Sequence, residues 1–188
     1  MEIKVIINPI AGAGPAKRLL SNLFYGCGYN FYRCERQLRT DDLLIRGKLR
    51  QLLVECRSHL ISLELAFRRE HRAQPGRDYA FLHPAALPTA QALLRARRNL
   101  ELMEMAVRTA TATDMGHIHE RHREERGILE KLVALDGEAL LALVTLRDSV
   151  ARLDDGAAAA AAMGNLLRAS GFTVLWGRRE SLLAGKSA

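Results

Sequence analysis

The feature that most constrains this chain is a long apolar seam with helical spacing between residues 45 and 67. Its apolar residues recur three or four positions apart, as they do along one face of an α-helix. The seam consists of Ile45, Leu49, Leu53, Cys56, Leu60, Leu63 and Phe67. Because such a face must be covered by another apolar surface, the seam predicts a helix that belongs to a bundle.

The helix predicted around this seam extends from about residue 29 to residue 72. Asp42 stands where the backward extension of the seam would place an apolar residue. Thr40-Asp41-Asp42 could instead cap a separate helix. A continuous helix of this length would span roughly 66 Å at ~1.5 Å per residue. A single helix of about 20 residues cannot cover the apolar face of so long a helix. We therefore expect the long helix to break near Thr40, two shorter helices to pack along it in series, or a partner to cover the part of its face that remains exposed.

Further amphipathic segments follow the first helix. A second helix is predicted over about 88–107, and a third from a cap at Asp114 to about Leu135. Asp136 is expected to cap a fourth helix that ends near residue 153. A run of six alanines opens a last helix over 157–170, and Gly171 is suited to the position that follows a helix.

Two short segments favour strands at the ends of the chain. Residues 3–7 and 172–176 are rich in β-branched or aromatic side chains. We expect them to lie side by side and parallel, because the helices between them supply the crossover that parallel strands need. The residues after Gly177 are expected to be frayed.

These elements predict a mainly α protein, an antiparallel helical bundle with minor β-strands at the two chain ends. We expect more than about 60% helix, well above the average for globular proteins. Residues 1–188 are predicted to form a single domain. The bundle covers about 29–170, and residues 1–20 and 164–177 are suited to a small βα unit.

Composition excludes several classes of protein. The chain has 188 residues, of which 48% are hydrophobic and 26% charged, which is typical of a globular domain. No apolar run approaches the ~18 residues of a membrane helix, and we find no secretory signal. The three cysteines lack a CxxC pair, so they predict neither a disulfide framework nor a zinc ribbon. Buried thiols in a reducing cytoplasm are the simpler interpretation.

The net charge of +7 rests on 28 lysines and arginines against 21 acidic residues. Arginines form clusters at 68–72, 95–98 and 121–126, which could bind phosphates of a nucleic acid. The clusters lack interleaved aromatic residues, and most have acidic neighbours. A nucleic-acid partner is therefore the weaker alternative to a protein partner or self-association.

Residues 4–20, which read KVIINPIAGAGPAKRLL, resemble the opening strand, glycine turn and helix of diacylglycerol kinase-type lipid kinases. Residues 166–174 resemble the helix end and second strand of the same domains, and no family is recognised for 21–163. The resemblance implies a nucleotide or phosphate site at Asn8, Gly12, Gly14 and Lys17, where backbone N–H groups at a helix start would face an anion. The Gly-Gly-Asp-Gly-Thr motif of that family is absent. We therefore do not expect lipid phosphorylation.

A metal-binding bundle is another alternative. His119 and His122 are three residues apart and would share a helix face. Glu55 and His59, four residues apart on the first helix, could complete the site across the bundle. A solvated, charged helix face is the competing interpretation of these residues. The sequence leaves the identity of any cofactor unknown.

An aromatic segment between residues 24 and 32 is the most distinctive local feature. Its five rings belong to Phe24, Tyr25, Tyr29, Phe31 and Tyr32. They could cap one end of the bundle, or form an exposed patch that binds a partner. The leading hypothesis from the sequence is a cytoplasmic, non-catalytic interaction or regulatory protein. The nucleotide- or phosphate-binding module is the alternative, and the metal-binding bundle is the second alternative.

Overall fold

The computed structural model describes residues 35–72, 82–110 and 126–184. Helices account for most of these residues, which confirms the predicted helical class. The elements are α2 (Glu35–Glu70), the short 3-10 helix η1 (Pro84–Ala86), α3 (Leu87–Thr109), α5 (Arg126–Ala151), α6 (Gly156–Ser170) and α7 (Phe172–Leu183). Within the described ranges, no helix is long and apolar enough to cross a membrane.

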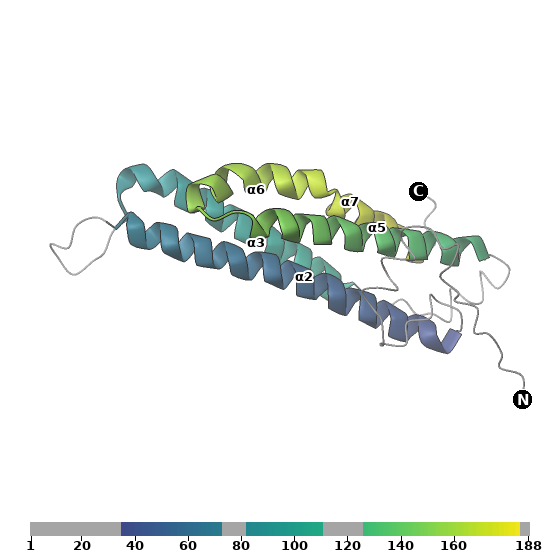
Figure 1. Cartoon of the computed structure of the whole chain (residues 1–188). Helices are drawn as coiled ribbons and strands as arrows, with labels where there is room; N and C mark the ends of the chain where they lie inside the picture. Colours follow the sequence, from purple (N-terminus) through teal and green to yellow (C-terminus); the bar gives the residue numbers. More distant parts are fainter. Residues whose placement is uncertain (1–34, 73–81, 111–125, 185–188) are drawn as a thin grey trace, which may run out of the picture.

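The helices form an elongated bundle in which successive long helices run in opposite directions (Figure 1). Helix α2 packs against both α3 and α5, and α6 packs against α3, α5 and α2. Helix α7 follows α6 and packs against α5. The fourth position of the bundle is thus shared by α6 and α7 in series.

Helix α2 is continuous from Glu35 to Glu70, without the break that Thr40-Asp41-Asp42 allowed. Every residue of the predicted seam between Ile45 and Phe67 is buried. Helices α6 and α7 follow one another at the fourth position. Helix α6 packs against α2, as expected for a shorter helix along so long a partner, whereas α7 packs against α5 and reaches α2 through the Arg179–Asp42 pair. Asp42 is also buried on this face, although it is charged.

The prediction that Asp136 caps a fourth helix is wrong. Helix α5 passes through this position without interruption from Arg126 to Ala151. The Asp136 side chain is 0% exposed and pairs with Arg179 of α7. A contact between distant segments therefore overrides the preference of aspartate for helix starts.

The predicted strand over 172–176 is also wrong, because these residues begin α7. Phe172, Trp176, Arg179 and Leu183 are spaced four, three and four residues apart and are all buried. This helical period outweighs the β-branched and aromatic composition of the segment. The expected pairing with residues 3–7, which lie outside the described residues, cannot form with a helix. Residues beyond Gly177 continue the helix to Leu183 rather than fraying.

The predicted start and end of α6 are confirmed. The carboxylate of Asp155 accepts a hydrogen bond from the backbone N–H of Ala158 at 2.9 Å, which caps the helix. This bond and others from neighbouring N–H groups hold the pKa of Asp155 below its ordinary value. Gly171 ends the helix with φ of 63°, in the left-handed region that favours glycine.

The start of α6 approaches α2 closely at Gly156. A Cβ atom at this position would lie 2.6 Å from the Cβ of Phe67. Since the contact is with the stem of a buried side chain, a shift of the backbone would be needed to relieve it. The glycine thus sets how closely α6 can approach α2 at this end of the bundle.

We expect Gly156→Ala to lower the free energy of unfolding by about 1–3 kcal/mol, as overpacking does in a close-packed core. Gly47→Ala is the matched control, because nothing lies within 4 Å of the added methyl group. That helical substitution should raise stability by roughly 0.5–1 kcal/mol. Urea denaturation measures both, and equal stabilisation by the two substitutions would contradict the close approach.

Candidate functional site

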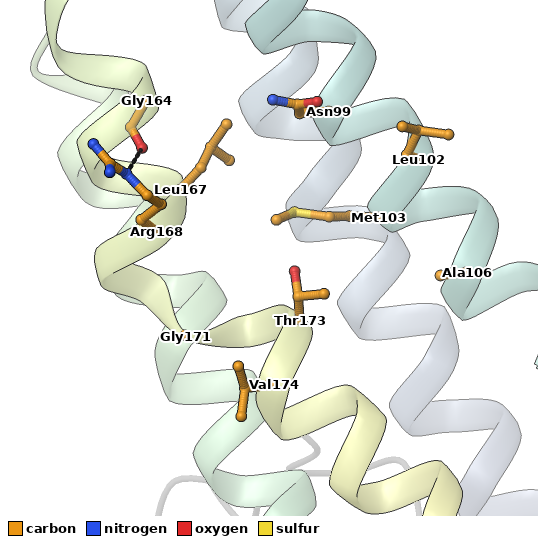
Figure 2. Close-up of a pocket in the computed structure, with 10 residues that line it drawn as sticks. All are labelled: Asn99, Leu102, Met103, Ala106, Gly164, Leu167, Arg168, Gly171, Thr173 and Val174. Atoms are coloured by element: carbon orange, nitrogen blue, oxygen red, sulfur yellow. Dashed lines mark hydrogen bonds between the residues drawn. The ribbon is translucent and has the colours of Figure 1, made fainter.

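An open groove of about 640 Å³ lies between α3 and the junction of α6 with α7 (Figure 2). Helix α3 contributes one wall, and the end of α6 and the start of α7 contribute the other. The lining residues are Asn99, Leu102, Met103, Ala106, Gly164, Leu167, Arg168, Gly171, Thr173 and Val174. Most of these side chains are apolar, and none is acidic.

The groove lies where α6 ends and α7 begins, because these two helices pack against different helices of the bundle. Up to Ser170, α6 packs against α3. The left-handed turn at Gly171 then redirects the chain, and α7 packs against α5. The C-terminal part of α3 is left without an equally close neighbour on this side.

Apolar side chains of the groove remain open to solvent. Leu102 is 56% exposed and Val174 is 60% exposed. Met103 and Leu167 project from the two walls into the space between α3 and α6 and are more buried (Figure 2). A concave surface with exposed apolar side chains is typical of a binding site rather than of a solvated helix face.

The charges beside this groove are basic. Arg168 lies in the lining, where its guanidinium donates to the Asn165 side-chain oxygen at 2.7 Å and to the Gly164 carbonyl at 3.3 Å. Arg95 is exposed on the α3 face that carries Asn99, one turn earlier. Arg178 is exposed one turn beyond Val174.

Acidic residues of α3 point to the other side of that helix, toward α2. Glu104 lies 3.7 Å from Arg50 and 3.4 Å from Arg57, and Glu101 lies 3.9 Å from Arg57. Glu64 of α2, which is buried, pairs with Arg97 of α3 at 3.2 Å. The acidic side chains of α3 are thus engaged between α2 and α3, away from the groove.

A second constellation is a buried cluster of charges at the end of the bundle where α2 and α5 begin. Arg179 donates from Nε to Asp136 at 2.6 Å and from an NH2 nitrogen to Asp42 at 2.6 Å. The other Asp42 oxygen accepts from Arg46 Nε at 2.8 Å, and Arg46 also donates to the carbonyl oxygen of Ala110. The two carboxylates and two guanidinium groups balance in charge and join α2, α3, α5 and α7.

Neighbouring side chains of α7 complete this cluster. The Arg179 guanidinium lies 4.9 Å from the centre of the Trp176 ring, which in turn stacks on Phe172. Burial raises the pKa of Glu180, although Arg179 acts in the opposite direction. Because the folded state disfavours the ionised form, this carboxyl group costs stability above its folded pKa, and the cost falls as the pH is lowered. We interpret the cluster as a structural link between helices.

The predicted metal ligands are not assembled by the described residues. The Nε2 of His59 donates to the carbonyl oxygen of Leu153 at 2.7 Å. Glu55 accepts a hydrogen bond from Gln51 at 2.9 Å. His119 and His122 lie outside the described residues, and within them no group of three or more His, Cys, Asp or Glu side chains could hold a metal ion. The metal site stays a prediction.

The other predicted site residues also lie outside the described part of the chain. They are the phosphate-binding set Asn8, Gly12, Gly14 and Lys17, and the aromatic set Phe24, Tyr25, Tyr29, Phe31 and Tyr32. Both hypotheses remain predictions from sequence.

Reasoning from sequence missed the groove. Within the predicted helix over about 88–107, an apolar seam consists of Leu93, Ala96, Leu100, Met103 and Val107. Leu100 and Val107 are buried as predicted, whereas Met103 is only partly buried and lines the groove. Leu102 falls off this seam, and an exposed leucine outside a seam is the signal that could have marked a second apolar face. Val174 carries no such signal, because the composition of residues 172–176 favours a strand, in which an exposed valine is ordinary.

No protein-family model, curated protein or solved structure matches this chain.

We expect Arg179→Met to lower the free energy of unfolding by about 3–5 kcal/mol, because it removes one partner from two buried carboxylates. Arg178→Met changes the adjacent, exposed arginine and should stay within about 0.5 kcal/mol of the wild-type protein. Urea denaturation of both variants tests this expectation. Equal stability of the two variants would show that the buried pairs do not hold the helices together.

Cys56 is 1% exposed, and burial raises the pKa of its thiol to about 11. In a Cys27→Ser/Cys34→Ser variant, we therefore expect the remaining thiol to resist an aromatic disulfide reagent at pH 8 until urea unfolds the chain. Absorbance of the released thiolate gives the rate. Rapid reaction in the folded protein would contradict a core position.

Proposed function

We propose that this chain is a non-catalytic interaction protein whose groove between α3 and the α6–α7 junction binds an amphipathic helix of a partner. The observation that carries the proposal is the set of exposed apolar side chains, above all Leu102 and Val174, that line a groove with a volume of about 640 Å³. Burial of such side chains favours association by the hydrophobic effect.

The shape of the groove supports a helix as its occupant. From Asn99 to Ala106 the groove follows α3 for two turns, or about 10 Å. Its walls are helices, so a third helix can pack against both by fitting side chains between theirs. A partner helix would give α3 the neighbour that it loses at Gly171. Three apolar anchors at positions i, i+3 or i+4, and i+7 fit this length.

The chemistry of the lining supports binding rather than catalysis. The lining residues include one guanidinium group and one hydroxyl group, and no carboxylate, imidazole or thiol. The buried charges elsewhere in the described helices are engaged with one another, as Asp42, Asp136 and Arg179 illustrate. These groups contribute to the packing of the bundle.

A direct test uses a synthetic helical peptide of about 18 residues. The peptide carries a leucine stripe at the spacing above and glutamine at the flanking polar positions. Fluorescence anisotropy of the labelled peptide measures its affinity. We expect Leu102→Asp to weaken binding at least tenfold, because it places a charge against the apolar stripe.

Leu141→Asp is the matched control, since Leu141 is 54% exposed on α5 and does not line the groove. It should leave the affinity of the peptide unchanged, and circular dichroism should show that both variants remain folded. Absence of peptide binding to the wild-type protein would refute the proposed function. Equal losses from the two substitutions would refute the location of the site.

A further inference from the structure

The groove is basic as well as apolar, and this combination restricts its partner. Arg168 lies in the wall formed by α6. Arg178 on α7 and Arg95 on α3 extend the same faces beyond the groove. All three residues are exposed, so their guanidinium groups are open to a ligand.

Carboxylates of the bundle do not neutralise this side of the molecule within the described residues. Glu101 and Glu104 of α3 face the arginines of α2, and α6 contains no acidic residue. Glu180 of α7 is half-buried beside Arg179. The bonds of Arg168 to Asn165 and Gly164 are made on the surface, where a carboxylate can replace them.

We propose that the partner helix is acidic, with an apolar stripe that fills the groove and flanking carboxylates that pair with Arg168, Arg178 and Arg95. This inference rests on the proposed function and adds the chemical class of the partner. Guanidinium groups bind carboxylates through paired hydrogen bonds, so they select for acidic residues at the edges of the stripe. Charge complementarity of this kind contributes specificity and a faster association rate.

The same charges disfavour a second copy of the chain as the occupant. In a two-fold symmetric contact centred on the groove, each groove would meet the identical groove of the other copy. Arginines of the two copies would then face one another, and like charges in contact oppose association. The net charge of +7 adds to this repulsion.

A flat anionic bilayer also fits the groove less well than a helix. Membrane-surface binding relies on side chains that protrude and insert into the lipid. Met103 and Leu167 instead line a hollow between α3 and α6, into which both side chains project (Figure 2). A helix can bring its side chains into that hollow, whereas a lipid surface would leave it unfilled.

The test compares three peptides that share one leucine stripe and differ at the flanking positions, which carry glutamate, glutamine or lysine. The full chain is titrated with each labelled peptide at low salt. We expect the glutamate peptide to bind at least tenfold more tightly than the lysine peptide, with the glutamine peptide between them. Added salt should reduce the difference, because the pairs are exposed and the Debye length is about 10 Å at 0.1 M.

Charge reversal in the protein locates the effect. In an Arg168→Glu/Arg178→Glu variant, the order of the glutamate and lysine peptides should reverse. Arg69→Glu/Arg72→Glu, which changes exposed arginines near the end of α2, is the matched control and should leave the order unchanged. Both variants replace two arginines by glutamates, so the control shows the effect of the altered net charge alone.

The outcomes separate the two proposals. If the glutamine peptide binds in a Leu102-dependent manner but the three peptides have equal affinity, the acidic partner is wrong and the proposed function stands. If no peptide binds, both are wrong. Two other results would contradict an acidic helix as the occupant. One is a doubled mass in sedimentation that Leu102→Asp abolishes, which would indicate a second copy of the chain. The other is Leu102-dependent binding to phosphatidylserine vesicles without binding of any peptide.

Discussion

The arrangement of the bundle depends on the burial of Arg179 between two aspartates that come from different helices. Arg179 is 1% exposed and reaches Asp136 of α5 and Asp42 of α2. A guanidinium group can satisfy two carboxylates at once because its donors lie in a rigid plane. The contact fixes where α7 lies along α5. Since a buried charge without its partner is strongly unfavourable, positions of α7 that separate Arg179 from these carboxylates are disfavoured.

This position of α7 also accounts for the groove. Helix α6 contacts α3, and α7 is held against α5 by the buried arginine, so the chain must turn between them. Gly171 makes the turn with φ of 63°. Leu102, Met103 and Ala106 then line one wall of the resulting hollow. The candidate binding surface is thus a consequence of how the charged cluster places the last helix, and it requires no residue dedicated to the hollow itself.

The two kinds of charged contact have different roles in this molecule. Buried pairs such as Asp136 with Arg179 determine which helices meet, because removal of one partner leaves the other in an apolar environment. Exposed arginines such as Arg168 and Arg178 contribute little to stability and remain available to a partner. The basic character of the whole chain therefore says less about the proposed partner than the positions of these few arginines relative to the apolar groove.

The sequence by itself determined the helical class, the apolar seam of α2, and the approximate bounds of α6, which was predicted over 157–170 with Gly171 after it. These features depend on local spacing and capping, which act within a few residues of the chain. Only the tertiary structure decided that Asp136 lies inside a helix and that Phe172 begins one. Their preferences were overridden by Arg179 and by packing against α5, partners that are distant along the chain. The groove could not be predicted for the same reason, because its walls come from helices that meet only in the folded bundle.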